Sequence, residues 1–375
     1  MAKKLKIALV HDYLLDYGGA ERVLLELHRM YPRAPIYVSL VDKKGMGEFM
    51  ELFSDAKINK SWFHYIPFSS KLISPLRFMI PLIWASFDFP EYDLVITSAS
   101  WAVTKGMRKG NKTKEVCYCH TPPRYLYGYD TSRIWKGKWY GFLVDIYSTI
   151  VNHFMRMYDY NQAQKVDYFV ANSENTGKRI EKFYRRKYKV VYPPIDVDEI
   201  IKSKVKPANG EYYLTGGRMM AAKNFDLIIK ACKKAKQNLK IFGDGIDRES
   251  LDKLAGKSKY IEFLGRISDE EKIAYLKGAR AFIVAQEDED FGITPIEAAA
   301  AGCPAIAYRG GGYLESVAEG KTGVFFDKMS TASLISAMDK LGKANIKSAD
   351  CIEHTKKFSV ERFRKEITNF VNKHA

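Results

Sequence analysis

Short apolar runs that end in polar or glycine-containing turns recur along the chain. In the first half such runs are typical of buried parallel strands. Between them, apolar residues such as Val23, Leu24 and Leu27 recur at helical spacing. Alternating strands and helices predict a doubly wound α/β domain. The strands expected there cover residues 6–10, 35–40, 92–98, 115–119 and 167–171.

The same alternation continues in the second half. Expected strands cover residues 188–192, 211–215, 239–242, 260–264, 281–284, 304–307 and 323–325, with helices at 226–236, 269–277 and 295–301. Pro193 and Pro194 stop regular structure, so we place a domain boundary there, between residues 1–192 and 193–358. A last helix, residues 359–373, has an apolar face that needs a partner, formed by Phe363, Ile367, Phe370 and Val371.

A length of 375 residues suits two domains. The five cysteines are odd in number, and the spacing of Cys117 and Cys119 suits neither a disulfide nor a zinc site, which favours a reducing, cytoplasmic compartment. We expect no signal peptide, because only four apolar residues follow Lys6 before His11. We also expect no membrane span, because the chain lacks a run of 18 apolar residues.

The net charge of +16 is concentrated in the first half. Residues 1–195 carry 30 Lys and Arg against 18 Asp and Glu, a net charge of +12. Nucleic acid, an anionic membrane surface and a phosphorylated substrate all fit such a balance, and solubility alone is the remaining explanation. The aromatic stretch 62–87, interrupted by prolines and by Lys71 and Arg77, either packs against the first sheet or forms a membrane-facing surface.

Two cations follow the first expected strand of the second domain. Arg218 and Lys223 lie five positions apart, directly after the tandem glycines Gly216 and Gly217. Arginine offers a planar fork to phosphate oxygens and lysine a point charge, and ligands of such folds bind at the carboxyl ends of strands. The pair therefore predicts a diphosphate site, with a solvated helix start as the alternative.

Two carboxylates, Glu289 and Glu297, flank a turn that leads into a helix for which Pro295 is a good first residue. Glu297 can accept hydrogen bonds from ribose hydroxyls, and Glu289 can reach a transferred sugar. Backbone amides between them can face a phosphate or a sugar hydroxyl. The alternative is a solvated acidic loop. The amides belong to Phe291, Gly292, Ile293 and Thr294.

In the first domain, candidate residues follow the expected strands. Gly18 and Gly19 lie between a strand and a helix, where the backbone can approach an anion, although a simple turn explains them equally well. His120 follows a strand and can contact a sugar or transfer a proton, with a structural histidine as the alternative. His11 and Asp12 end the first strand and are candidate acceptor-side groups.

No metal-binding pattern is evident, so we expect neither a metal nor a cofactor. Side-chain cations and helix dipoles would then neutralise a leaving diphosphate.

In order along the chain, a series of short motifs resembles the retaining glycosyltransferases of family 4, which have the GT-B fold, and the resemblance covers nearly the whole length. The run from His120 through Thr121, Pro122, Pro123 and Arg124 looks most like GDP-mannose-dependent mannosyltransferases that build O-antigen and other surface polysaccharides. The motif residues are Gly18 to Glu21, Cys119 to Pro122, Ala171 to Glu174, Tyr192 to Pro194, Gly217, Arg218, Lys223, Asn224, Phe242 to Gly245, Phe263 to Gly265, Glu289, Phe291, Gly292 and Glu297.

The resemblance implies two Rossmann-like domains that face a central cleft, with the donor held mainly by the second and the last helix returning to the first. It assigns Arg218 and Lys223 to the diphosphate, Glu297 to the ribose, Glu289 to the donor sugar and His120 to the transferred sugar. Gly19 matches a loop amide near the phosphate. The base would lie near Gly243, Asp244 and Ile267, and the acceptor side would include Asp12, Tyr13 and Arg124.

One residue departs from the family pattern. Asp290 stands where these enzymes have glycine, which restricts the turn and adds negative charge beside the sugar. The identity of the donor sugar therefore stays open.

The function that we expect is transfer of a hexose, in the first place mannose from GDP-mannose, with retention at the anomeric carbon. The acceptor would be a glycan or a lipid-diphosphate-linked sugar, reached from the cytoplasmic face of the membrane. A UDP-sugar-dependent transferase or a sugar-nucleotide epimerase on the same fold is the enzymatic alternative. A nucleic-acid-binding protein is the alternative from another class, although the chain matches no known DNA- or RNA-recognition module.

Overall fold

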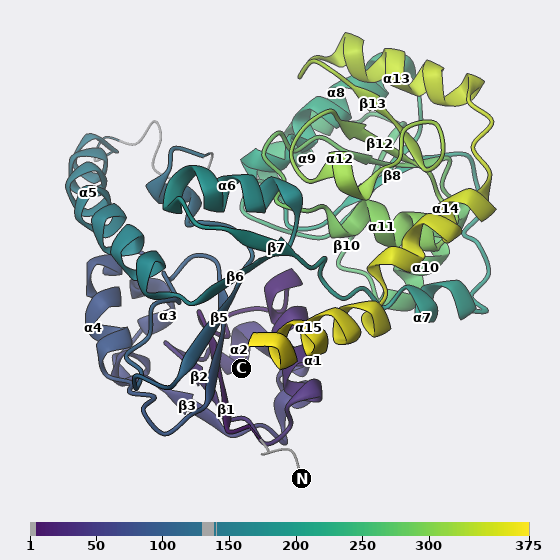
Figure 1. The fold of residues 1–375 in the computed structure, drawn as a ribbon. Coiled ribbons are helices and arrows are strands. Elements are labelled where there is room, and N and C mark those ends of the chain that lie inside the picture. The colour runs from purple at the N-terminus through teal and green to yellow at the C-terminus, as the bar shows by residue number, and fades with distance from the viewer. Residues whose placement is uncertain (1–4, 130–138, 140, 375) are drawn as a thin grey trace. The chain divides into compact units, whose positions relative to one another are not determined.

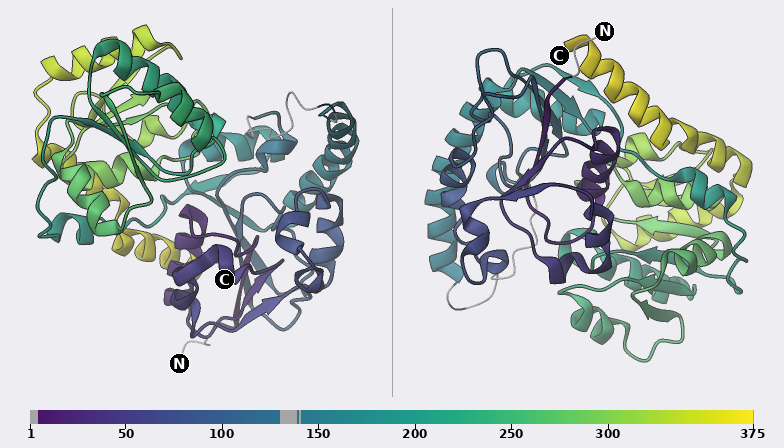
Figure 2. Two further views of the ribbon diagram at one scale, coloured as in Figure 1. Left: turned by 180° about the vertical axis from the view of Figure 1, so that it is seen from behind. Right: turned by 90° about the horizontal axis from the view of Figure 1, so that it is seen from below.

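The computed structural model describes residues 5–129, 139 and 141–374, in two compact units (Figure 1). Unit 1 comprises Met1–Pro194 together with Val360–Ala375, and unit 2 comprises Ile195–Ser359. Each unit is built on one parallel sheet with helices on both faces (Figures 1 and 2). The expected α/β class with two Rossmann-like domains is confirmed.

The sheet of unit 1 has the order β3-β2-β1-β4-β5-β6-β7, with every pair parallel. β1 and β4 are buried at every position, which is why they read as continuous apolar runs. The strands are β1 (Ile7–His11), β2 (Ile36–Val38), β3 (Ile58–Lys60), β4 (Leu94–Ala99), β5 (Lys114–Cys119), β6 (Tyr168–Ala171) and β7 (Tyr188–Val190). The helices are α1 (Gly19–Met30), α2 (Lys43–Met46), α3 (Ser69–Leu72), α4 (Ile80–Ala85), α5 (Gly141–Lys165), α6 (Glu174–Tyr184) and α15 (Val360–His374).

The sheet of unit 2 has the order β10-β9-β8-β11-β12-β13, again parallel throughout. The strands are β8 (Tyr213–Gly216), β9 (Leu239–Phe242), β10 (Ile261–Gly265), β11 (Ala281–Val284), β12 (Ala305–Tyr308) and β13 (Gly323–Phe326). The helices are α7 (Val197–Lys202), α8 (Phe225–Ala235), α9 (Arg248–Ala255), α10 (Asp269–Gly278), α11 (Ile293–Ala300), α12 (Tyr313–Ser316), α13 (Thr331–Lys343) and α14 (Ser348–Thr355).

Both sheets contain a point where the strand order reverses. In unit 1 the chain moves outward from β1 to β3 and then restarts beside β1 with β4. In unit 2 it moves from β8 to β10 and restarts beside β8 with β11. Connections leave such neighbours in opposite directions, so the carboxyl ends of the two strands are open to a ligand.

The strands expected from the sequence are present, with ends shifted by at most two residues. β3 was not expected, because Ile58, Asn59 and Lys60 are all only partly buried and form no apolar run. α1 begins at Gly19, with Gly18 as its N-cap. One expected helix start is corrected, because α11 begins at Ile293, so that Pro295 is its third residue and not its first.

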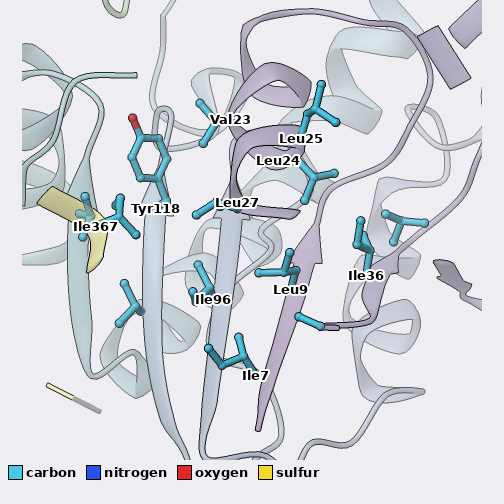
Figure 3. Close-up of a cluster of buried hydrophobic side chains, with 14 of the residues drawn as sticks. Ile7, Leu9, Val23, Leu24, Leu25, Leu27, Ile36, Ile96, Tyr118 and Ile367 are labelled. Carbon is cyan, nitrogen blue, oxygen red and sulfur yellow. The ribbon is translucent and has the colours of Figure 1, made fainter. Parts of the chain in front are cut away.

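The last helix, α15, packs its apolar face into the core of unit 1, as expected. Phe363, Ile367 and Val371 are buried, and the Phe363 ring lies 5.8 Å from that of Tyr118 in β5. Figure 3 shows Ile367 beside Tyr118 on the face of the sheet that also receives Leu24 and Leu27 of α1. The chain thus leaves unit 1 near Pro194 and returns to it to complete one core.

The aromatic stretch 62–87 packs in part against the first sheet, as one of its two interpretations predicts, and its contact with a membrane stays a prediction. Phe63, Ile83 and Trp84 are buried against the opposite face of the same sheet. Tyr65 and Phe68 are each 76% exposed. The stretch is built of short helical turns and has both an inner and an outer surface. Within the part of the chain that the structure describes, no helix has the length and apolar character needed to cross a membrane.

We expect Phe363→Ala to destabilise unit 1 by about 3–5 kcal/mol, because it removes a buried ring on which the docking of α15 depends. All five tryptophans, at positions 62, 84, 101, 135 and 139, belong to unit 1, so urea unfolding followed by tryptophan fluorescence reports on that unit. Thr368→Ala, on the exposed side of α15, is the control and should change stability by less than about 0.5 kcal/mol. Equal midpoints for both variants would contradict the prediction.

Candidate functional site

The loop after β8 places the ammonium group of Lys223 next to Gly217. Gly217 has φ +117°, and a Cβ placed on it would lie 3.1 Å from Lys223 Nζ. Asn224 adopts a left-handed conformation and donates from Nδ2 to the carbonyl of Ala285, 2.8 Å away, just beyond β11. This bond ties the cation loop to the acidic loop across the point of strand reversal. Arg218, next to Gly217, is exposed.

The loop after β9 packs against the loop after β8 with no room for a side chain. A Cβ on Gly243, which has φ +101°, would lie 2.1 Å from the Gly217 carbonyl oxygen. The backbone amide of Met219 donates to the Asp244 carbonyl at 2.8 Å. Two of the predicted donor-binding segments, at Gly243 with Asp244 and at Gly217 with Arg218, therefore form one surface.

Glu289 is held by the glycines that follow β12. Its carbonyl accepts from the Gly312 amide at 2.8 Å, and Tyr313 Oη donates to its Oε2 at 3.5 Å. Gly292 has φ +86°, and a Cβ there would lie 2.7 Å from the Tyr313 ring. Gly292 is thus the left-handed residue of this turn and Asp290 is not, so the aspartate that departs from the family pattern imposes no backbone strain.

Phe291 belongs to the core of unit 2. Its side chain is buried, and its ring meets that of Phe358 edge-on at 5.5 Å. Contact with a donor would therefore involve the backbone amide of this residue. Ile293 and Thr294, the first residues of α11, are only partly buried.

Glu297 is paired with a lysine that the sequence analysis missed. Lys272 Nζ lies 3.2 Å from Glu297 Oε1, and the carboxylate side chain is only 6% exposed. Lys272 extends from the first turns of α10, which begins after the capping box of Ser268 and Glu271. The available signal was a lysine near a helix N-terminus, where the dipole disfavours a cation. Ile267, just before this helix, is half-buried.

The first-domain candidates meet at the reversal between β1 and β4. Glu21 Oε2 accepts from the Gly18 amide at 2.9 Å, and Glu21 Oε1 lies 3.4 Å from His11 Nε2. His11 Nδ1 lies 3.0 Å from Ser98 Oγ, which is 2.8 Å from His120 Nε2. Gly18 and His120, 102 positions apart in sequence, are thereby joined by one chain of polar contacts. Ser98 was not expected from the sequence.

Asp12 anchors the loop that follows β4. It is 1% exposed, and its Oδ2 accepts from the amides of Ser100, Trp101 and Ala102 and from the Ser100 hydroxyl. Its Oδ1 accepts from the Thr104 hydroxyl. These bonds give Asp12 a structural role, and its contact with an acceptor stays a prediction.

The other acceptor-side candidates are more accessible. Tyr13 and Arg124 are both half-buried, and the Tyr13 ring lies 6.2 Å from that of Trp101. Their contact with an acceptor also stays a prediction.

The cysteines offer no reactive group. All five are buried and unbridged, and burial raises the pKa of the Cys117 thiol to about 12. Within the described residues, no group of three His, Cys, Asp or Glu side chains is placed to hold a metal ion.

Comparison with known proteins shows that both the sequence and the fold are similar to those of glycosyltransferases. The model for Glycosyltransferase Family 4 matches residues 17–199, and that for Glycosyl transferases group 1 matches residues 196–358. Alpha-1,3/1,6-mannosyltransferase ALG2 of Dictyostelium discoideum is 25% identical over 431 residues, covering 99% of each chain. HepE of Anabaena, in a structure with UDP and glucose, aligns with a TM-score of 0.69 at 17% identity, covering 98% of this chain and 100% of the other. Sucrose-phosphate synthase of Thermosynechococcus elongatus aligns with a TM-score of 0.71 at 15% identity, covering 99% of each.

The fold, two units with reversal points that carry the motif residues, is that of the GT-B glycosyltransferases. The two family models together match residues 17–358. The chain is thus a glycosyltransferase that carries a Glycosyltransferase Family 4 domain followed by a group 1 domain.

We expect Gly243→Ala to destabilise unit 2 by roughly 1–3 kcal/mol more than Gly256→Ala. Both glycines have positive φ, at +101° and +60°, but an added Cβ meets the Gly217 carbonyl at 2.1 Å in the first case and nothing nearer than 3.9 Å in the second. The comparison thus separates the clash from the backbone strain. Urea unfolding followed by far-UV circular dichroism measures both, and equal losses would contradict the close packing of the two loops.

Proposed function

We propose that the enzyme transfers mannose from GDP-mannose to a glycan or lipid-linked acceptor with retention of the anomeric configuration. The observation that carries the proposal is that the segments of Lys223, Glu289 and Glu297 follow β8 and β11 at the open edge of one sheet, where Asn224 bonds the carbonyl of Ala285. The mannosyl specificity is supported by the whole-length similarity to a protein named as a mannosyltransferase.

In the proposed reaction, Arg218 and Lys223 bind the diphosphate and stabilise its growing charge as the bond from the anomeric carbon to the phosphate oxygen breaks. The acceptor hydroxyl attacks from the same face and forms the new glycosidic bond. Its proton passes to a diphosphate oxygen of the leaving group, which balances the exchange. Glu297 orients the ribose, and His120 orients the transferred sugar.

A UDP-sugar donor is the second candidate. The observation that favours it is the likeness in fold to HepE, whose structure contains UDP and glucose. The same cations serve either diphosphate, so the base and the sugar distinguish the two donors.

A panel of GDP, UDP and ADP, each alone and as a sugar conjugate, tests the donor. GDP and GDP-mannose should raise the melting temperature, because they bind the native state alone. Lys223→Ala should lower the transfer rate roughly 30- to 900-fold, the loss expected for one charge-assisted contact in the transition state. Lys234→Ala, an exposed lysine of α8, is the control and should behave like the wild type. A larger shift with UDP sugars would select the second donor, and no response to any nucleotide would refute both.

Contact with an anionic membrane is a separate part of the proposal, supported by where apolar side chains are exposed. Among the described residues, fifteen large apolar side chains are exposed in unit 1 and two, Ile246 and Leu314, in unit 2. On α5 they repeat at helical spacing and so share one face, which we call the apolar α5 face. It consists of Phe142, Ile146, Ile150, Phe154 and Met157.

The helix that carries the apolar α5 face contacts the aromatic stretch 62–87 through other residues of α5. Arg77 Nε donates to Asn152 Oδ1 at 2.8 Å, and the Arg77 guanidinium lies 5.1 Å from the Tyr147 ring. The stretch contains no Asp or Glu and presents the exposed Lys71. The exposed apolar α5 face, the exposed Lys71 and the net charge of +12 in residues 1–195 together fit a surface of anionic headgroups over an acyl layer.

We expect the double variant Ile150→Glu with Phe154→Glu to lose binding to vesicles of phosphatidylglycerol and phosphatidylcholine, because two charges would have to enter the acyl boundary. Ile246→Glu with Leu314→Glu makes the same change in unit 2 and should bind like the wild type. Co-sedimentation measures binding, with pure phosphatidylcholine vesicles as the test of charge. Equal sedimentation of both double variants would refute the assignment. A change in oligomeric state on altering α5, without a change in vesicle binding, would assign the face to a second copy.

A further inference from the structure

The polar chain at the β1 and β4 reversal runs through four buried side chains from four elements. Glu21 in α1, His11 in β1, Ser98 in β4 and His120 after β5 have exposed fractions of 6%, 1%, 1% and 8%. Because each contact joins residues distant in sequence, their alignment is a property of the fold and not of one loop.

The number of protons that these four side chains carry sets the direction of the hydrogen bonds between them. The Glu21 carboxylate is an acceptor at both oxygens, one of which takes the Gly18 amide. A neutral His11 therefore donates from Nε2 to Glu21 and accepts at Nδ1. Ser98 has one hydroxyl proton, and it donates this proton in a hydrogen bond to His11 Nδ1. The Ser98 oxygen therefore accepts from His120 Nε2–H.

We propose that Glu21, His11 and Ser98 are positioning residues that hold neutral His120 as the Nε2–H tautomer. The inference rests on the proposed contact of His120 with the transferred sugar. The lone pair of the ring is then on Nδ1, so His120 meets a sugar hydroxyl as an acceptor through that atom. A ring held in the other tautomer would offer a donor there.

The same carboxylate links this ring to the glycine segment. Glu21, in the first turn of α1, accepts from the Gly18 amide with one oxygen and faces His11 with the other. A shift of the helix start would therefore move the end of the polar chain. Glu21 thus couples the loop predicted to lie near the phosphate to the side chain predicted to contact the sugar.

Glu21→Gln tests the direction of the chain without removing a heavy atom from the side chain. The oxygen of the introduced carboxamide must still accept from the Gly18 amide, which leaves its NH₂ group facing His11 Nε2. His11 then accepts at Nε2 and donates from Nδ1 to Ser98 Oγ, and the Ser98 hydroxyl donates to His120 Nε2, which must carry the lone pair. His120 is thereby converted to the Nδ1–H tautomer, three contacts away from the substitution.

The readout is the ¹⁵N spectrum of the imidazole nitrogens in histidine-labelled enzyme at about pH 8, where the neutral ring is the ordinary form. We expect His120 to be protonated at Nε2 in the wild type and at Nδ1 in Glu21→Gln, with kcat/KM for sugar transfer about tenfold lower or more in the variant. Ser98→Ala should lower kcat/KM similarly, and Ser98→Thr, which keeps the hydroxyl, should restore it.

Thr97→Val is the matched control, because Thr97 precedes Ser98 on β4, is equally buried and points to the other face of the sheet. It should leave both the tautomer and the transfer rate of the enzyme unchanged. An Nδ1–H ring in the wild type, or an unchanged tautomer in Glu21→Gln, would overturn the proposed direction. A changed tautomer with wild-type kcat/KM would overturn the positioning role. Absence of sugar transfer by the wild type would refute the proposed function while the tautomer measurement still decided the direction.

Discussion

The point of strand reversal in each parallel sheet is the constraint on which the candidate sites depend. Between β1 and β4, and between β8 and β11, the chain leaves neighbouring strands in opposite directions, so helical connections do not cover their carboxyl ends. The motif residues of unit 2 lie at the carboxyl ends of β9 and β10 or in the segments that follow β8, β9 and β11 at this edge. The sites thus follow from topology before any side chain is considered, and the side chains then determine what each edge can bind.

Close packing of the loops converts that open edge into a defined surface. Gly217 and Gly243 bring two loops within a distance that a Cβ would forbid, while Gly292 lets the acidic loop turn against Tyr313. Asn224 then connects the cation loop to the carbonyl of Ala285. Because these restraints act on the backbone, the positions of Lys223 and Glu289 are set largely by residues that carry no charge.

Much of the fold could be predicted because a buried parallel strand leaves a plain apolar run. β9 and β11 have the bounds that the sequence indicated, whereas β3, with three partly exposed residues, left no such signal. The motifs identified which residues to examine at the site, and their ligand contacts stay predictions. Lys272 and Ser98 were missed for one reason: each matters through a partner far away in sequence, Glu297 or the two histidines, and periodicity records only local neighbours.

Glu21 and Glu297 show how each unit keeps a buried carboxylate near its reversal point. Removing such a charge from water is costly unless partners replace the lost hydration. Glu21 accepts from the Gly18 amide and faces His11, whereas Glu297 pairs with Lys272. Glu21 also lies in the first turn of α1, where the helix dipole favours negative charge. The contacts that offset desolvation also fix the orientation of the oxygens, so a ligand hydroxyl that reached Glu297 would meet a carboxylate already ordered by the fold.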